Sequence, residues 1–374
     1  MKARIALLRS MGAARPYQDT KPLEIVEVDL DEPGAGEVRV KMVAAGLCHS
    51  DLSVINGDRP RDMPVALGHE ASGIIEAIGP GVSRFVPGDH VVLVFVPSCG
   101  HCVPCASGRP ALCEPGAAAA AKGTLIGGER RLRYKGQPVN HHIGVSAFST
   151  HAVVSVNSCV KIDKSIPLDK AALLGCAVLT GVGAVLNSGE LKMGESCAVI
   201  GLGGVGLAGL LGAIAAGAQT IIAVDTAENK RAMALELGAT HVIDPMADDA
   251  VAQVKTLTGG GVDLAVELAG AAPALKFAYD ITRRGGTTVT GGLPNPKAEL
   301  HIPAVSLTVG EQTLKGSYVG SCVPVRDIPR FAAMMQSGRL PIEKLVTHTI
   351  SLDEINEGFE RLATGEAIRQ IVRF

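Results

Sequence analysis

The chain has 374 residues, of which 47% are apolar, so it can form two domains with a substantial core and is not a disordered chain. Its 35 basic and 37 acidic residues give a net charge of −2, which offers no reason to expect nucleic acid or an anionic membrane as a partner. Glycine is enriched, with 45 residues and no collagen period, which indicates many tight turns. With 3% aromatic residues and no tryptophan, a lectin-like or base-stacking surface is not expected.

Nine cysteines are present, and four of them fall within fifteen residues. The opening residues, MKARIALLRSMG, lack the apolar core and cleavage site of a secretory signal and are expected to form a first strand. We therefore expect a cytoplasmic protein whose clustered cysteines bind metal instead of forming disulfides.

The first part of the chain, to about residue 155, is expected to be β-rich. Short apolar or alternating runs, separated by proline and glycine, predict strands at 24–30, 37–46, 71–79, 90–96 and 146–155. The stretch 113–140 has the character of a loop, and its basic patch at 129–136 is expected to be solvated.

From about residue 170 the pattern alternates between strands and helices. Strands are predicted at 197–201, 220–225, 241–244, 264–270, 286–292 and 313–320, and helices at 204–217, 227–238, 248–257 and 273–283. This alternation predicts an α/β domain with a parallel, doubly wound sheet. The run 197–218 has no polar side chain and is long enough to span a bilayer, but its seven glycines favour a strand, a turn and a buried helix. The tail, 325–374, is expected to hold two helices and a last strand.

A dinucleotide-binding pattern lies at the start of this second part. Gly201, Gly203 and Gly206 form GxGxxG between a predicted strand and a predicted helix, and Asp225 ends the next strand nineteen residues later. The helix N-terminus would bind phosphates, and Asp225 would hydrogen-bond ribose hydroxyls and repel a 2′-phosphate, which favours NAD over NADP. The alternative is a glycine-rich contact between helix and strand.

Two groups of residues suggest metal sites. The spacing of Cys99, Cys102, Cys105 and Cys113 can close a tetrahedral structural zinc site, with an iron–sulfur cluster as the less favoured alternative. A dispersed group is formed by Cys48-His49-Ser50-Asp51, Gly68-His69-Glu70 and Cys176. Two thiolates and an imidazole would leave one zinc position open, but each residue alone is as well explained by a place in the core.

The motifs together resemble the zinc-dependent alcohol dehydrogenases of the medium-chain dehydrogenase/reductase family. The stretch GHEASGIIEAIG is similar to that family's zinc signature and is followed by a family-like VPGDHV at 86–91. The CHSD motif, the cysteine cluster, Cys176 and the glycine turn come in family order over nearly the full length. The resemblance implies a GroES-like catalytic domain from 1–178 and 320–374, with a structural zinc lobe at 95–115, and a Rossmann domain at 179–319. It also implies a homodimer joined near residues 300–318.

The resemblance further implies a role for individual residues. Catalytic zinc ligands match Cys48, His69 and Cys176; the four clustered cysteines match structural zinc ligands; and catalytic or supporting roles match Ser50, Asp51 and Glu70. Cofactor-contacting positions match His49, Thr180, Gly201, Gly203, Gly204, Val205, Gly206, Asp225, Lys230, Ser317, Val319 and Arg369. Substrate-pocket positions match Phe95, His142, Ile143, Leu293 and Tyr318.

The implied reaction is the reversible oxidation of a primary alkyl or aryl alcohol to an aldehyde, with two zinc ions per subunit and hydride transfer to NAD. Ser50 would accept the alcohol proton, although Ser53 stands where many relatives end the proton relay with histidine, so that the relay would end in water or at His49. A further hypothesis is that His142 lines the substrate pocket and tunes the choice of alcohol in a pH-dependent way between pH 6 and 8. The alternative is a structural loop histidine bonded to backbone or water.

Other functions are weighed against this one. The second choice of substrate is S-(hydroxymethyl)glutathione, the formaldehyde adduct, which the mixed charges of residues 58–62 disfavour. A non-catalytic protein that binds zinc and NAD is disfavoured because no zinc ligand is missing. A nucleic-acid-binding zinc ribbon is disfavoured by the near-neutral charge.

Overall fold

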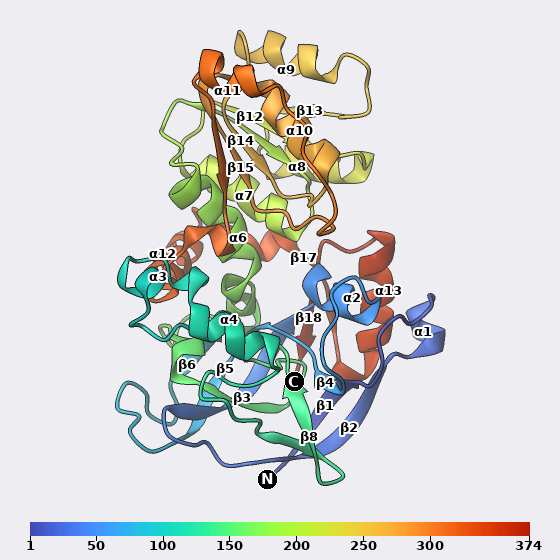
Figure 1. Ribbon diagram of the computed structural model, residues 1–374, viewed down its shortest axis with the longest axis vertical. Helices are drawn as coiled ribbons and strands as arrows, with labels where there is room; N and C mark the ends of the chain where they lie inside the picture. The colour runs from blue at the N-terminus through green and yellow to red at the C-terminus, as the bar shows by residue number, and fades with distance from the viewer. The chain divides into compact units, whose positions relative to one another are not determined.

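The computed structural model describes every residue from Met1 to Phe374 and divides the chain into two compact units (Figure 1). The first contains Met1–Cys176, Val323–Gln336 and Glu343–Phe374, and the second contains Ala177–Cys322 and Ser337–Ile342. The chain therefore leaves the first unit after Cys176 and returns to complete it with its last residues.

The first unit contains a small closed barrel. Its strands lie in the order β1, β2, β7, β8, β4, with bounds Lys2–Leu8, Leu23–Leu30, Leu132–Tyr134, Gln137–His141 and Val65–Ala66. Neighbours are antiparallel except β4 and β8, which run parallel. The barrel brings the segment before His69 next to the segment before His142, because Ala66 pairs with His141.

A seven-stranded sheet forms the rest of the framework of this unit. Its strands lie in the order β10 (Cys159–Lys161), β6 (His90–Leu93), β5 (Glu70–Ile78), β3 (Glu37–Gly46), β18 (Arg369–Arg373) and β17 (Val346–Ile350). A seventh strand, β9 (His151–Ser155), also pairs with β3. The C-terminal strand pairs with the end of β3, where Ile371 lies opposite Gly46. This pairing carries Arg369 to the same end of the sheet as Cys48 and Glu70.

The alternation of side chains explains the main core. In β3, Val38, Val40 and Met42 are buried, whereas the intervening Arg39 and Lys41 are not. Helix α13, Ile355–Thr364, covers this core with residues spaced for one face, and its Phe359 ring meets Phe148 edge-on at 5.8 Å.

Further helices and turns connect the strands of the first unit. The α-helices are α1 Tyr17–Thr20, α2 His49–Ile55, α3 Val103–Ala106, α4 Glu114–Ala121, α5 Leu168–Ala171 and α12 Pro324–Gln336. The 3₁₀ turns are Pro110–Leu112, Val156–Ser158, Ala172–Gly175 and Leu352–Glu354, and a further turn, Ile342–Leu345, begins on the last residue of the second unit.

The prediction that 113–140 is a loop is wrong. The alanine run lies in α4, which begins directly after Cys113, and the basic patch contains β7. Leu132 of this patch is buried in the barrel, while Arg131 pairs with Glu37 at 2.7 Å. Long-range pairing in the barrel therefore fixes a segment whose local sequence carries no strand pattern.

The second unit is built on a six-stranded parallel sheet. Its strands lie in the order β13 (His241–Ile243), β12 (Thr220–Val224), β11 (Ser196–Ile200), β14 (Val262–Glu267), β15 (Thr282–Thr290) and β16 (Thr313–Gly316). In chain order this is 3-2-1-4-5-6, the order of doubly wound dinucleotide-binding domains, and the strand order reverses beside β11. The predicted parallel sheet is confirmed.

Helices connect these strands at close to the predicted positions. They are α6 Ala177–Gly183, continued by a π-helical turn Ala184–Ser188, then α7 Gly204–Ala215, α8 Glu228–Leu237, α9 Ala250–Thr258, α10 Ala272–Ile281 and α11 Ala304–Gly310, with a 3₁₀ turn at Val319–Ser321. Gly181 allows α6 to pack against α7, since a Cβ there would lie 2.1 Å from the Val205 carbonyl oxygen.

The apolar run 197–218 forms a strand, a turn and the twelve-residue helix α7, as expected. No single helix is long and apolar enough to cross a membrane. One bent pair, Leu168–Gly175 with Ala177–Ser188, reaches the required length and composition only when both are taken together.

Candidate metal centres and nucleotide site

Three side chains distant in sequence converge in the first unit. Cys48 joins β3 to α2, His69 precedes β5, and Cys176 follows the 3₁₀ turn Ala172–Gly175; all three are buried. The Cys176 Sγ lies 3.4 Å from His69 Nε2. Sulfur and nitrogen ligands of one tetrahedral zinc ion would lie about 3.6 Å apart, so the arrangement fits such an ion.

A buried pair of opposite charges lies beside these ligands. The Arg369 Nη1 lies 3.5 Å from Glu70 Oε2 and donates to the Leu47 carbonyl at 3.2 Å, and both side chains are almost fully buried. Burial raises the pKa of Glu70 to about 7, although Arg369 opposes this shift. Glu70 Oε1 has no hydrogen-bond partner, and a ligand atom of Glu70 lies within 4.8 Å of those of Cys48, His69 and Cys176.

The two buried thiols differ in acidity. A hydrogen bond from Cys176 lowers the pKa of Cys48 well below that of a free thiol, while the same bond and burial raise the pKa of Cys176. A metal that binds both sulfurs must therefore displace a proton from Cys176.

Asp51 supports His69 from its other side. The Asp51 Oδ2 lies 3.0 Å from His69 Nδ1, and Oδ1 accepts a hydrogen bond from the Gly68 amide at 3.0 Å. Burial disfavours a charged imidazole, but Asp51 and Cys48 together outweigh burial and raise the pKa of His69 well above its usual value. A carboxylate on Nδ1 leaves Nε2, which faces Cys176, as the nitrogen available to a metal.

Ser50 and Ser53 lie on the helix that carries Asp51. Ser50 is half-buried and lies in the first turn of α2. The Ser53 hydroxyl donates to the His49 carbonyl at 2.8 Å, one turn earlier in α2. The Ser53 proton is thus already engaged, so Ser53 does not replace the missing relay histidine.

Three predicted pocket residues belong to the first unit. The Phe95 ring meets His69 edge-on at 5.1 Å, Ile143 has a left-handed φ of 42°, and His142 is 2% exposed. Burial lowers the pKa of His142 to about 4, with Asp51 opposing the shift. A pKa this low does not support the expected change of alcohol preference between pH 6 and 8, because it favours the neutral imidazole over that range.

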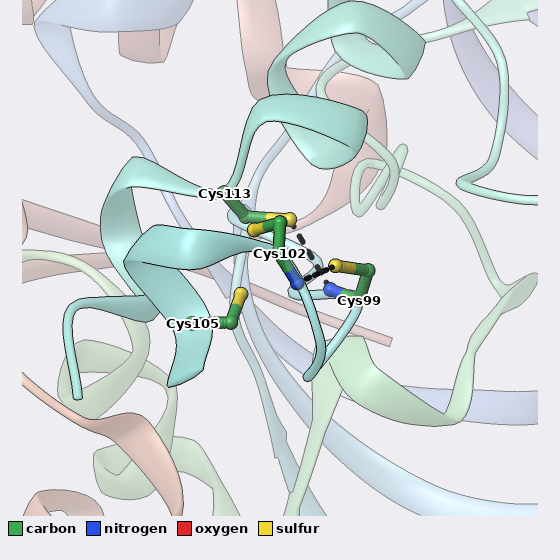
Figure 2. Close-up of side chains that lie close together, drawn as sticks. All are labelled: Cys99, Cys102, Cys105 and Cys113. Atoms are coloured by element: carbon green, nitrogen blue, oxygen red, sulfur yellow. Dashed lines mark hydrogen bonds between the residues drawn. The ribbon is translucent and has the colours of Figure 1, made fainter. Parts of the chain in front are cut away.

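The four clustered cysteines lie together in a separate lobe. Figure 2 shows their side chains turned toward a common point, and their sulfur atoms lie within 4.8 Å of one another. The Cys113 Sγ accepts bonds from the Cys99 and Gly116 amides, and the Cys99 Sγ accepts one from the Cys102 amide at 3.2 Å. Backbone hydrogen bonds from His101 and Cys102 lower the pKa of Cys99 to about 6. The arrangement fits a closed tetrahedral zinc site.

The glycine turn of the second unit is shaped by close approaches. Gly201 has a φ of 89°, and a Cβ on Gly206 would lie 1.7 Å from the Gly201 carbonyl oxygen, so both positions require glycine. A Cβ on Gly203 would meet nothing within 4 Å. The protein's own packing does not explain that glycine, whereas a phosphate group approaching the start of α7 would.

Asp225 connects this turn to the next strand. Its Oδ2 accepts the Leu202 amide at 2.7 Å and its Oδ1 accepts the Ala227 amide at 2.9 Å. Each carboxylate oxygen can accept a second bond, so capacity for ribose hydroxyls remains. Lys230 lies on α8 and is half-buried. Arg231, which was not predicted from the sequence, donates to the Asp225 and Thr226 carbonyls and so holds the end of β12; only its position six residues after Asp225 could have indicated it.

The remaining predicted residues of the second unit are more scattered. Thr180 and Val205 lie on the packed helices α6 and α7. The Ser317 hydroxyl is bonded to Ser188 at 2.6 Å, its amide donates to the Thr290 carbonyl at 2.8 Å, and Val319 is buried. Leu293 and Tyr318 are exposed in this unit.

Comparison with known proteins identifies the family. Residues 34–164 match the alcohol dehydrogenase GroES-like domain and 204–337 match the zinc-binding dehydrogenase domain. The NDMA-dependent alcohol dehydrogenase of Amycolatopsis methanolica is 41% identical and covers 100% of this chain and 99% of its own. A Mycobacterium tuberculosis relative that also carries an alcohol dehydrogenase name is 42% identical over 96% of this chain and 98% of its own. Benzyl alcohol dehydrogenase from Acinetobacter calcoaceticus superposes with a TM-score of 0.93 at 35% identity, over 100% of this chain and 99% of its own.

The chain therefore belongs to the zinc-dependent alcohol dehydrogenases of the medium-chain dehydrogenase/reductase family. It is an oxidoreductase with a GroES-like domain and a Rossmann domain, as the sequence predicted. These relatives do not favour the formaldehyde adduct as its substrate.

Proposed function

We propose that this alcohol dehydrogenase oxidises primary alkyl or aryl alcohols to aldehydes and transfers the hydride to NAD. The observation that carries the proposal is the presence of two separate sites, a buried Cys48–His69–Cys176 set and a glycine turn linked to Asp225. The apolar Phe95 and Ile143 support an apolar substrate, as does the benzyl alcohol dehydrogenase relative.

In the proposed mechanism a metal ion activates the alcohol, and side chains accept the proton and orient the ligands. A zinc ion held by Cys48, His69 and Cys176 would supply a Lewis acid that lowers the pKa of an alcohol hydroxyl. Ser50 accepts the hydroxyl proton and passes it toward solvent, since Ser53 is engaged with the backbone. Asp51 keeps His69 oriented, and Arg369 balances the charge of Glu70 beside the ligands. The four cysteines of the lobe would hold a second, structural zinc ion.

One relative suggests NDMA as an alternative electron acceptor. The Amycolatopsis methanolica enzyme, 41% identical, is NDMA-dependent by name. Parallel assays with NAD and with NDMA as the only acceptor distinguish the two functions, because our proposal requires turnover with NAD alone.

Asp225 is expected to set the preference for NAD. Asp225→Ser should lower kcat/KM for NAD by about 10- to 100-fold, the contribution of a hydrogen bond to a charged group, and improve use of NADP. The measurement is kcat/KM for both cofactors in the wild type and the variant. Asp248→Ser, which removes an exposed carboxylate between β13 and α9, is the matched control and should leave the ratio unchanged. A wild type that already prefers NADP would show that the assignment is wrong.

We further propose a cytoplasmic homodimer. Clustered thiols that bind metal instead of forming disulfides are typical of a reducing compartment. The strand β16 is an edge of its sheet, and Val305 and Val309 on the preceding helix α11 are 67% and 61% exposed. A second copy would cover these residues and the open edge. Sedimentation should give twice the chain mass for the wild type and the single-chain mass for Val305→Asp/Val309→Asp, whereas a monomeric wild type would contradict the proposal.

A further inference from the structure

His142 lies directly behind the zinc-supporting carboxylate and has no role in the mechanism above. Its Nε2 is 3.4 Å from Asp51 Oδ1, while His69 Nδ1 is 3.0 Å from Asp51 Oδ2. The two imidazole rings also meet edge-on, with centroids 5.8 Å apart. One buried carboxylate thus has an imidazole on each of its oxygens.

No other group in the structure offers a hydrogen bond to the His142 ring. The backbone amide of His142 donates to the Ala66 carbonyl at 3.3 Å and to the Ser146 hydroxyl at 3.2 Å. These bonds fix the backbone position from which the side chain extends. Both ring nitrogens are buried and lack a hydrogen-bond partner of good geometry. Because a neutral imidazole carries one N–H and burial of an unsatisfied donor is unfavourable, that proton belongs on the nitrogen nearest the carboxylate.

We propose that His142 is a positioning residue that donates its Nε2–H to Asp51 Oδ1 and thereby fixes the carboxylate that orients His69. The Gly68 amide holds the same oxygen from a second direction. Together they prevent the carboxylate from turning away from His69 Nδ1. The proposal rests on His69 as a zinc ligand, and it replaces the expectation that His142 faces the substrate.

The test is the rate at which the holoenzyme, without substrate, loses its catalytic zinc to an excess of chelator. His142→Phe keeps a ring but removes the donor, and it should release this zinc on the order of tenfold faster, at the lower end of the effect of groups that support metal ligands. His142→Gln places an amide near the position of Nε2 and should restore the wild-type rate. His142→Asn, whose shorter amide cannot reach Asp51, should not. The zinc of the cysteine lobe is the internal control and should leave at the same rate in every variant.

Cobalt substitution gives an independent signature. The visible d–d absorption of cobalt in the Cys48–His69–Cys176 site should change in His142→Phe and return in His142→Gln. Relative kcat/KM values for apolar and polar-tailed alcohols should stay constant in His142→Phe, because a positioning residue acts on all substrates alike.

Several outcomes would overturn the proposal. One is wild-type zinc release in His142→Phe together with an altered alcohol preference, which would make His142 a pocket residue. Equal release from His142→Gln and His142→Asn would show that reach toward Asp51 does not matter, even if His142→Phe fails to fold. Because release is measured without cofactor or alcohol, a wild type that binds zinc but does not reduce NAD would refute the proposed function and leave this test intact.

Discussion

Alcohol oxidation is expected to fall below detection in Cys176→Ala, while the fold is retained. Cys176 is buried at the end of the first unit's long N-terminal segment and supplies one of three ligands to the open zinc site. With two ligands left, the zinc that activates the alcohol would be lost. The core of the unit does not depend on that metal, because β3, β5 and α13 pack through apolar side chains. The measurements are kcat, zinc content and melting temperature.

Cys102→Ala is the matched comparison and should instead lower the melting temperature. No residue of α3 or of the turn Pro110–Leu112 is buried, and Val103 is 79% exposed, so the lobe has almost no apolar core. Its stability must come from the metal that joins its four thiolates. Equal losses of melting temperature in both variants, with activity retained in Cys176→Ala, would refute the division of the two sites into catalytic and structural.

Ser50→Ala should reduce kcat by about 10²- to 10⁴-fold, the usual contribution of a general acid–base group, without loss of zinc. Ser50 lies in the first turn of α2, two residues after the metal ligand Cys48 and directly before Asp51. Steady-state kinetics and metal analysis of the purified variant provide the measurement.

Ser53→Ala is the control for this effect. It removes a hydroxyl from the same helix, but one that donates to the His49 carbonyl, so kcat should change little. Ser50→Thr should retain activity because it keeps the hydroxyl. A loss of less than roughly threefold in Ser50→Ala would remove Ser50 from the mechanism.

The sequence predicted the parallel sheet well because its determinants are local. The strand CAVI, the glycine turn and the apolar helix follow each other directly. Gly201 has a left-handed φ of 89°, and Gly206 is required by the Gly201 carbonyl five residues earlier. The spacing of the four cysteines is similarly local, and the structure brings all four together.

Features that depend on distant pairing were not predictable in the same way. The strand β7 forms only because Leu132 pairs with Leu30 and Val139 in the barrel. The alanine run of α4 has no amphipathic pattern; its start is set by Cys113, whose sulfur accepts the Gly116 amide. The 3.4 Å approach of His142 Nε2 to Asp51 Oδ1 joins residues 91 positions apart, so no local pattern could predict it.

We propose that this zinc-dependent alcohol dehydrogenase uses free NAD. The decisive experiment follows NADH formation from benzyl alcohol, with NAD as the only acceptor, before and after removal of the catalytic zinc and after its return. We expect multiple turnovers with the zinc-loaded protein, loss of turnover on chelation and recovery with zinc. The proposal would be contradicted if the protein turned over with NDMA but not with NAD, or if NADH formation did not depend on zinc.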